Sequence, residues 1–119
     1  MNVSRETQER LEAFVALLQK WNPRINLVSG RDLAFVWERH VKDSLQIAPL
    51  VAGAGRFIDI GSGGGFPGIV AAIATNVPGT LIEADQRKAA FLREAARVSL
   101  APVTVLAERI EQAKVEPAP

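Results

Sequence analysis

The segment that decides the fold covers residues 56–68 and reads RFIDIGSGGGFPG. Residues 56–60 form a short apolar run that is typical of a buried strand, and the run ends in a glycine cluster at residues 61–65. A helix of small residues is predicted next, from about Pro67 to Thr75. A glycine-rich turn between a strand and a helix lets a ligand approach the backbone and the helix N-terminus.

Strands and helices alternate after this segment. The pattern predicts a strand at residues 80–82 that ends at Glu83, a helix at residues 86–99 and a strand at residues 103–106. This order is typical of an α/β fold with a parallel sheet of βαβ units. Three strands make half of a doubly wound sheet. We therefore interpret residues 56–119 as the first half of a Rossmann-like domain with a partial parallel sheet, in a chain that looks truncated.

Residues 1–55 predict a helical N-terminal extension. One apolar face is expected from residues spaced by three and four, namely Leu11, Phe14, Val15, Leu18 and Trp21. Ser4 or Thr7 could cap this helix, and Asn22-Pro23 should end it. A second helix is expected after Asp32 as N-cap. It should carry Phe35, Val36 and Val41 and close at Pro49, Gly53 and Gly55.

Composition bounds the class of protein. The 119 residues fit one domain, and 14 Lys and Arg against 13 Asp and Glu give a net charge of +1. The sum therefore indicates neither a nucleic-acid nor a membrane partner. With no cysteine and one histidine, disulfides and a His/Cys zinc site are excluded, and we predict no metal site. No apolar run reaches the roughly 20 residues of a membrane span, and we expect a cytoplasmic protein.

The glycine loop matches the dinucleotide pattern G-x-G-x-x-G through Gly63, Gly65 and Gly68. Asp59 lies just before the loop, where its carboxylate would repel a pyrophosphate. Pro67 removes one N–H that would bind phosphate. These two residues disfavour an NAD-type oxidoreductase, and the absence of Gly-Lys-Ser or Gly-Lys-Thr excludes a P-loop. A ligand with a cationic end and no phosphate, such as S-adenosylmethionine, suits the site better.

Glu83 supports this interpretation because it lies 20 residues after Gly63 at the end of a strand, where a carboxylate can accept both ribose hydroxyls. The competing interpretation is that Asp59 and Glu83 are ordinary loop carboxylates and that the glycines only form a tight turn.

Several motifs in order make the sequence similar to one family. Residues 57–68 resemble the cofactor loop of the glucose-inhibited division protein B family, bacterial methyltransferases that act on guanine N7 of 16S ribosomal RNA. The other matching motifs are Trp21-Asn22, Asn26-Leu27, Arg39-His40, Asp43-Ser44-Leu45, Arg87-Lys88, Phe91-Leu92 and Arg109-Ile110-Glu111. The resemblance covers nearly the whole chain.

The resemblance implies a Rossmann-like S-adenosylmethionine-dependent methyltransferase fold and methyl transfer to a guanine of 16S rRNA. It also implies that Gly61 and Phe66 line the cofactor pocket, that Glu83 meets the ribose, and that Ile110 and Glu111 border the adenine. The other cofactor-binding candidates are Asp59, Ser62, Gly63 and Gly65. Arg109 is the candidate catalytic residue. Guanine N7 carries no proton, so the reaction needs no general base, and catalysis would depend on orientation and electrostatics.

Basic residues gather between residues 20 and 42, with a local charge of +3. They could contact 16S rRNA or the small ribosomal subunit through phosphates, and the candidates are Arg24, Arg31, Arg39 and Lys42. A solvated helical face is the alternative. Arg87 and Lys88 open a helix, where basic side chains do not suit the dipole, which hints at a ligand or RNA. The competing function is a non-catalytic cofactor- or RNA-binding module that needs a partner to complete its sheet.

Overall fold

The structure, a computed structural model, describes residues 3–61 and 63–109. Its elements in chain order are α1 (Arg5–Ile25), α2 (Gly30–Ala34), the π-helical turn η1 (Trp37–Val41), α3 (Lys42–Ala52), β1 (Phe57–Ile60), α4 (Gly68–Thr75), β2 (Gly79–Ile82), α5 (Gln86–Ser99) and β3 (Val103–Leu106). The elements predicted from residue 56 onward are confirmed, with shifts of one residue at three boundaries.

The sheet is parallel throughout its described strands, in the order β1-β2-β3. The first residues of the strands are aligned, Phe57 with Gly79 and Gly79 with Val103, so all three strands end at the same edge. Within the described residues β1 pairs only with β2, and Ile60 at its end is 60% exposed. The prediction of a partial Rossmann-like sheet is confirmed.

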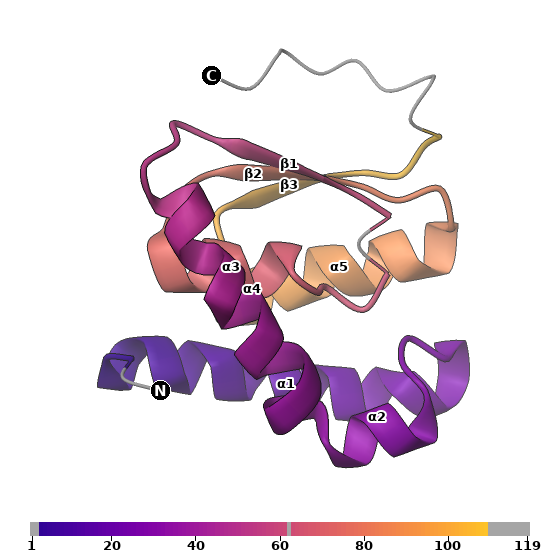
Figure 1. Cartoon of the computed structure of the whole chain (residues 1–119). Helices are drawn as coiled ribbons and strands as arrows, with labels where there is room; N and C mark the ends of the chain where they lie inside the picture. Colours follow the sequence, from indigo (N-terminus) through magenta and orange to yellow (C-terminus); the bar gives the residue numbers. More distant parts are fainter. Residues whose placement is uncertain (1–2, 62, 110–119) are drawn as a thin grey trace.

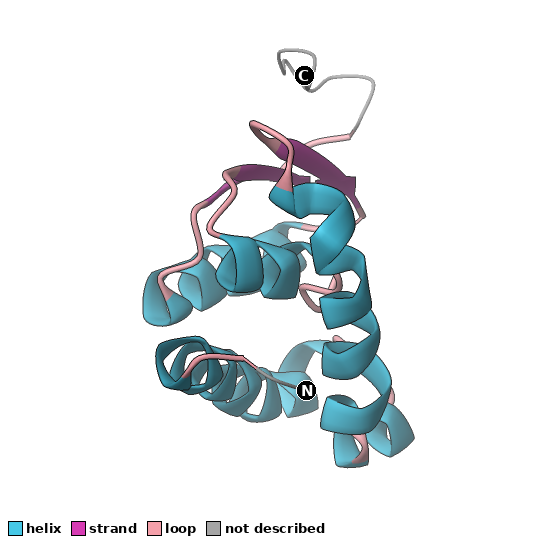
Figure 2. Ribbon diagram, turned by 60° about the vertical axis from the view of Figure 1, so that its left-hand side comes forward, coloured by secondary structure: helices cyan, strands magenta, loops and turns pink. Residues whose placement is uncertain are grey.

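The described helices lie on one side of this sheet, and α3 stands upright beside the others (Figures 1 and 2). α4 and α5 lie directly beneath the strands, and α1 packs against both helices from below. α1 and α5 are antiparallel, since Arg10 near the start of α1 donates to the carbonyl oxygens of Ser99 and Leu100 at the end of α5. The C-terminal end of α1 therefore lies beside the N-terminal end of α5.

α1 has the predicted apolar face and the predicted cap. Leu11, Phe14, Val15 and Leu18 are buried, and the Ser4 hydroxyl accepts a hydrogen bond from the Thr7 N–H at 3.1 Å. The predicted end at Asn22-Pro23 is wrong, because the helix includes Pro23 and continues to Ile25. Proline near a helix end removes a single hydrogen bond. The Asn22 side chain meanwhile fixes the next turn by bonding both the N–H and the carbonyl oxygen of Val28.

The second predicted helix is in fact three consecutive helical pieces. Its cap is not Asp32: the Ser29 hydroxyl accepts from the Asp32 N–H at 3.0 Å, and α2 begins at Gly30. Pro49 does not close the segment either, since it lies exposed inside α3, which continues to Ala52 and has Gly53 as its C-cap. Packing of α3 against α4 outweighs the local preference of Pro49 to end a helix.

A chain of aromatic rings ties α1 to the glycine loop and to α5. The Phe14 ring meets Phe66 edge-on with centroids 5.3 Å apart, and Phe91 lies 6.3 Å from Phe14 and 5.7 Å from Trp21. Phe14 and Phe91 are fully buried. Aromatic pairs at such distances stabilise a core beyond the area they bury. The helical extension thus shares one core with the residues beneath the sheet.

None of the helices in the described parts of the chain is long and apolar enough to cross a membrane.

Candidate functional site

A hollow of about 360 Å³ lies at the edge of the sheet where the three strands end. The residues that line it come from the ends of β1 and β2 and from the segment after β3, namely Ile60, Gly61, Ile82, Glu83, Ala84, Glu108 and Arg109. Ligands of open α/β sheets bind outside the carboxyl ends of the strands. The hollow is therefore the position at which this fold holds a small molecule.

Glu83 is the buried acid of this hollow, with 8% of its surface exposed. Its Oε1 accepts from the Gly63 N–H at 3.0 Å and its Oε2 from the Asp85 N–H at 2.9 Å. A carboxylate offers about four acceptor positions, so two remain after these bonds when residues 3–61 and 63–109 are considered. Glu83 both ties the glycine loop to the end of β2 and retains acceptors for a hydroxyl-bearing ligand.

Asp85 fixes the next element. Its carboxylate caps α5 by accepting from the backbone N–H groups of Arg87 at 2.9 Å and Lys88 at 3.1 Å. The Lys88 N–H is the main reason that the pKa of Asp85 lies below its usual value. The Gln86 amide also donates to the Ala107 carbonyl oxygen at 3.0 Å. The start of α5 is thereby held at the edge that carries the hollow.

Asp59 has a structural role that its sequence position did not reveal. Its Oδ2 accepts from the Gly68 N–H at 3.0 Å, at the first residue of α4. A side chain at residue 68 would be 2.5 Å from Asp59 Oδ2 and 2.6 Å from Leu81 Cδ2, so glycine is required there by packing. Asp59 therefore anchors the loop to the helix, and it is not among the described residues that line the hollow.

The glycines of the loop divide into two kinds. Gly65 has φ +96°, and a Cβ there would lie 2.9 Å from the Phe14 ring and 3.0 Å from Ile69. The space beside Gly61 is open within 4 Å, and a Cβ on Gly63 would meet only the Gly61 carbonyl oxygen at 3.9 Å. Packing therefore explains Gly65, whereas the open backbone of Gly61 and Gly63 leaves room for a ligand.

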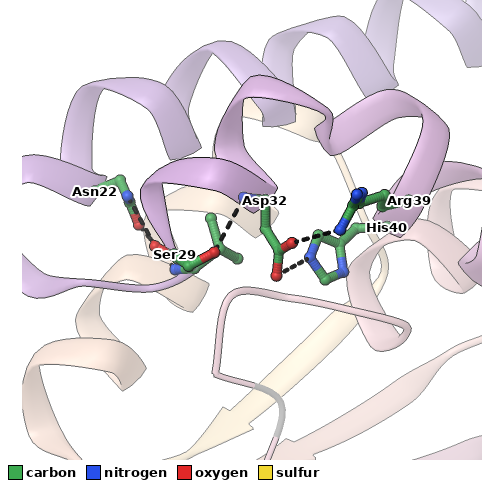
Figure 3. Close-up of polar contacts among 6 residues, drawn as sticks. Asn22, Ser29, Asp32, Arg39 and His40 are labelled. Atoms are coloured by element: carbon green, nitrogen blue, oxygen red, sulfur yellow. Dashed lines mark hydrogen bonds and ion pairs between the residues drawn. The ribbon is translucent and has the colours of Figure 1, made fainter.

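The far side of the loop rests on a polar cluster from the helical segment (Figure 3). The His40 ring stacks on Phe66 with centroids 5.0 Å apart. Its Nε2 lies 3.3 Å from Asp32 Oδ2, and Arg39 Nη1 lies 3.5 Å from Asp32 Oδ1. Phe66 is thus held between His40 and Phe14, so it supports the loop from the side that faces α1.

The structure brings together only some of the predicted site residues. Gly61, Glu83 and Arg109 line the hollow, and Gly63 reaches it through its bond to Glu83. Asp59, Gly65 and Phe66 instead hold the loop in place. The predictions for Ser62, Ile110 and Glu111 lie outside the described residues.

Sequence reasoning missed four residues of the hollow, Ile60, Ile82, Ala84 and Glu108. Each of them directly adjoins the end of a strand or a predicted site residue. The signal that would have found them is their place on the chain, because parallel strands gather their carboxyl ends at one edge.

The predicted RNA-binding residues come from four different helical elements. Arg31, Arg39 and Lys42 belong to α2, η1 and α3, and Arg39 is paired with Asp32. Arg24 lies in the last turn of α1, where it lines a second hollow with Arg87 from α5.

The residues of the first hollow fit the chemistry of S-adenosylmethionine. Glu83 has free acceptor positions for ribose hydroxyls, and the backbone beside Gly61 is open. Glu83 and Glu108 carry more negative charge than Arg109 balances, which suits a cationic ligand and disfavours a pyrophosphate.

Comparison with known proteins extends these observations. Residues 7–118 match the family described as rRNA small subunit methyltransferase G. The "Ribosomal RNA small subunit methyltransferase G" of Gluconobacter oxydans is 62% identical over 116 residues, and that of Granulibacter bethesdensis is 56% identical over 118. Both alignments cover 98% of this chain but only 60% and 55% of the relatives. The chain therefore spans somewhat more than half the length of these curated relatives.

A solved structure shows the same fold. The O-methyltransferase from Bacillus cereus in complex with SAH matches with a TM-score of 0.56 and 20% identity, over 99% of this chain and 53% of that chain. The Rossmann-like fold expected for this chain is confirmed by this match. With the family match over residues 7–118 and relatives above 50% identity, the chain belongs to the rRNA small subunit methyltransferase G family.

Proposed function

We propose that this chain serves the transfer of a methyl group from S-adenosylmethionine to N7 of a guanine in 16S rRNA, in the cytoplasm. The observation that carries the proposal is the hollow at the strand ends, in which the buried Glu83 keeps acceptor positions free beside the open glycine backbone. Its family membership supports the same activity.

The residues of the chain would bind S-adenosylmethionine and orient it toward the guanine. S-adenosylmethionine, when bound, supplies an activated methyl group on its sulfonium. Glu83 would accept hydrogen bonds from the ribose hydroxyls, and the backbone of Gly61 would allow close approach. Glu108 and Arg109 border the same hollow after β3. Because guanine N7 is attacked through a free lone pair, these residues need only hold two reactants in line, which is a proximity and orientation effect.

The test is calorimetric titration of the chain with S-adenosylhomocysteine. We expect saturable binding to the parent chain. The affinity of the Glu83→Ala variant should be lower by a factor of roughly 10 or more, since a hydrogen bond between a ligand and a buried carboxylate contributes about 1.5–3 kcal/mol. Glu94→Ala is the matched control, because Glu94 lies on the far part of α5 and pairs with Arg97. A chain that is folded by circular dichroism and gives no heat would contradict the cofactor site.

Methyl transfer is tested separately with radiolabelled S-adenosylmethionine and 16S rRNA, either free or in small subunits. Label in 7-methylguanine supports the full proposal. Saturable cofactor binding without any label would instead support the alternative, a non-catalytic module that needs a partner.

A further inference from the structure

A second hollow lies between the last turns of α1 and the first turns of α5, with a volume of about 330 Å³. Trp21 and Ile25 from α1 and Ala90 from α5 give it an apolar floor. Lys20 and Arg24 from α1 and Arg87 from α5 surround that floor. We call these six residues the α1/α5 groove.

The three cations of the groove are available to a ligand. All three side chains are exposed, and across residues 3–61 and 63–109 none of them lies within 4 Å of a carboxylate oxygen. Two acids lie within electrostatic range of the groove cations, Glu94 of Lys20 and Asp85 of Arg87. Their hydrogen bonds go to other groups, since Glu94 bonds Arg97 and Asp85 caps α5. The groove therefore combines about three positive charges with an apolar surface.

The groove also lies at the functional end of the molecule. α5 begins at Gln86, three residues after Glu83, and Arg87 is in its first turn. In Figure 1 the C-terminal end of α1 and the N-terminal end of α5 lie at the same side as the ends of the strands. A polymer bound in the groove can thus extend toward the hollow that holds Glu83.

We infer that the α1/α5 groove binds one nucleotide of a single-stranded RNA segment that leads to the target guanine. This inference rests on the proposed function. The phosphate would lie among Lys20, Arg24 and Arg87, and the base or ribose would contact the apolar floor. A volume of about 330 Å³ is near the lower limit of about 300 Å³ for ligand pockets, which suits one nucleotide. A paired strand fits less well, because its bases are stacked inside the duplex and cannot reach the floor.

The groove contains its own reporter, since the chain has two tryptophans and Trp21 is the one on the groove floor. Replacing Trp37, which is partly buried against the core, by phenylalanine leaves Trp21 as the single fluorophore. We expect a single-stranded RNA 15-mer to change Trp21 fluorescence saturably, and a duplex of the same sequence to bind more weakly. Signal of equal strength from polyglutamate would overturn the inference in favour of an acidic peptide.

The decisive variant is Lys20→Gln/Arg24→Gln/Arg87→Gln in the Trp37→Phe background. Each neutralised phosphate contributes about −0.7 to the slope of log affinity against log salt for single strands. Because one phosphate lies in the groove, we expect the slope to become shallower by roughly 0.7. The affinity should fall by roughly 10-fold or more, since charge-assisted hydrogen bonds to the phosphate are lost. Arg5→Gln is the control, because Arg5 is an exposed arginine at the opposite end of α1.

A second set of variants separates the groove from the other basic residues. Arg31→Gln/Arg39→Gln removes two cations that lie outside the groove. The inference is overturned if this pair lowers RNA affinity while the groove triple does not, or if RNA leaves Trp21 unchanged. S-adenosylhomocysteine titration of the groove triple should match the parent. If the parent binds S-adenosylhomocysteine but the groove triple binds RNA as tightly as the parent does, the groove inference alone is refuted. If the parent does not bind S-adenosylhomocysteine, the proposed function is refuted.

Discussion

Gly65→Ala should destabilise the chain strongly, because two separate costs meet at one residue. The backbone at residue 65 has φ +96°, and a Cβ would lie 2.9 Å from Phe14 Cζ and 3.0 Å from Ile69 Cγ1. Positive φ costs a residue with a side chain about 1–2 kcal/mol, and overpacking a core costs about 1–3 kcal/mol. Together they predict that the free energy of unfolding falls by roughly 2–5 kcal/mol, a large share of the about 5–15 kcal/mol that is typical of native proteins.

Urea denaturation followed by far-UV circular dichroism measures this loss. With a slope of about 1–3 kcal/mol per molar urea, the midpoint should fall by roughly 1 M or more. Gly53→Ala is the matched control, since Gly53 has φ −90° and a Cβ there would meet nothing within 4 Å. That variant should be neutral or more stable by about 0.4–1 kcal/mol, because alanine restricts the unfolded chain.

A double-mutant cycle with Phe14→Leu tests the stated cause. Leucine lacks the Cζ and Cε1 atoms that a side chain at residue 65 would meet, so Gly65→Ala should cost less in that background. Contacting residues couple by about 0.5–3 kcal/mol. Additive effects within about 0.5 kcal/mol, or a Gly65→Ala variant as stable as the parent, would refute the reasoning.

Further substitutions test the remaining core and caps by the same denaturation assay. Leu18→Ala should cost about 2–5 kcal/mol, because Leu18 is fully buried; a loss below about 1 kcal/mol would contradict its place in the core. Asn22→Asp should cost about 1–3 kcal/mol, since it keeps the acceptor for the Val28 N–H but sets an oxygen against the Val28 carbonyl. Unchanged stability would exclude that pair of bonds. Asp85→Ala should destabilise at pH 7. The pKa of Asp85 is lowered on folding from its usual 3.8. The difference in free energy of unfolding between the parent and the variant should therefore persist above that pH and shrink as the pH falls through the folded pKa. A difference that is constant to pH 2 would contradict the charged cap.

The sheet and α5 were predictable because their signals are local. Val103–Leu106 and Gln86–Ser99 lie within the predicted bounds, since short apolar runs and a helical spacing bounded by turn residues specify strands and helices. The segment around Asp32 and Pro49 was not predictable in this way. There the packing of α3 against α4 overrides what the single residues prefer.

The sequence by itself determined the order of the elements, the family resemblance and the identity of the acid at the end of β2. It could not assign Asp59 and Phe66, because their roles depend on partners that the fold brings close: the Gly68 N–H for Asp59, and His40 and Phe14 for Phe66. Nor could it unite Arg24 with Arg87, which lie on two antiparallel helices far apart in the chain. Local patterns specify elements through short-range hydrogen bonding and periodicity, whereas a site is built from side chains that only tertiary packing places together.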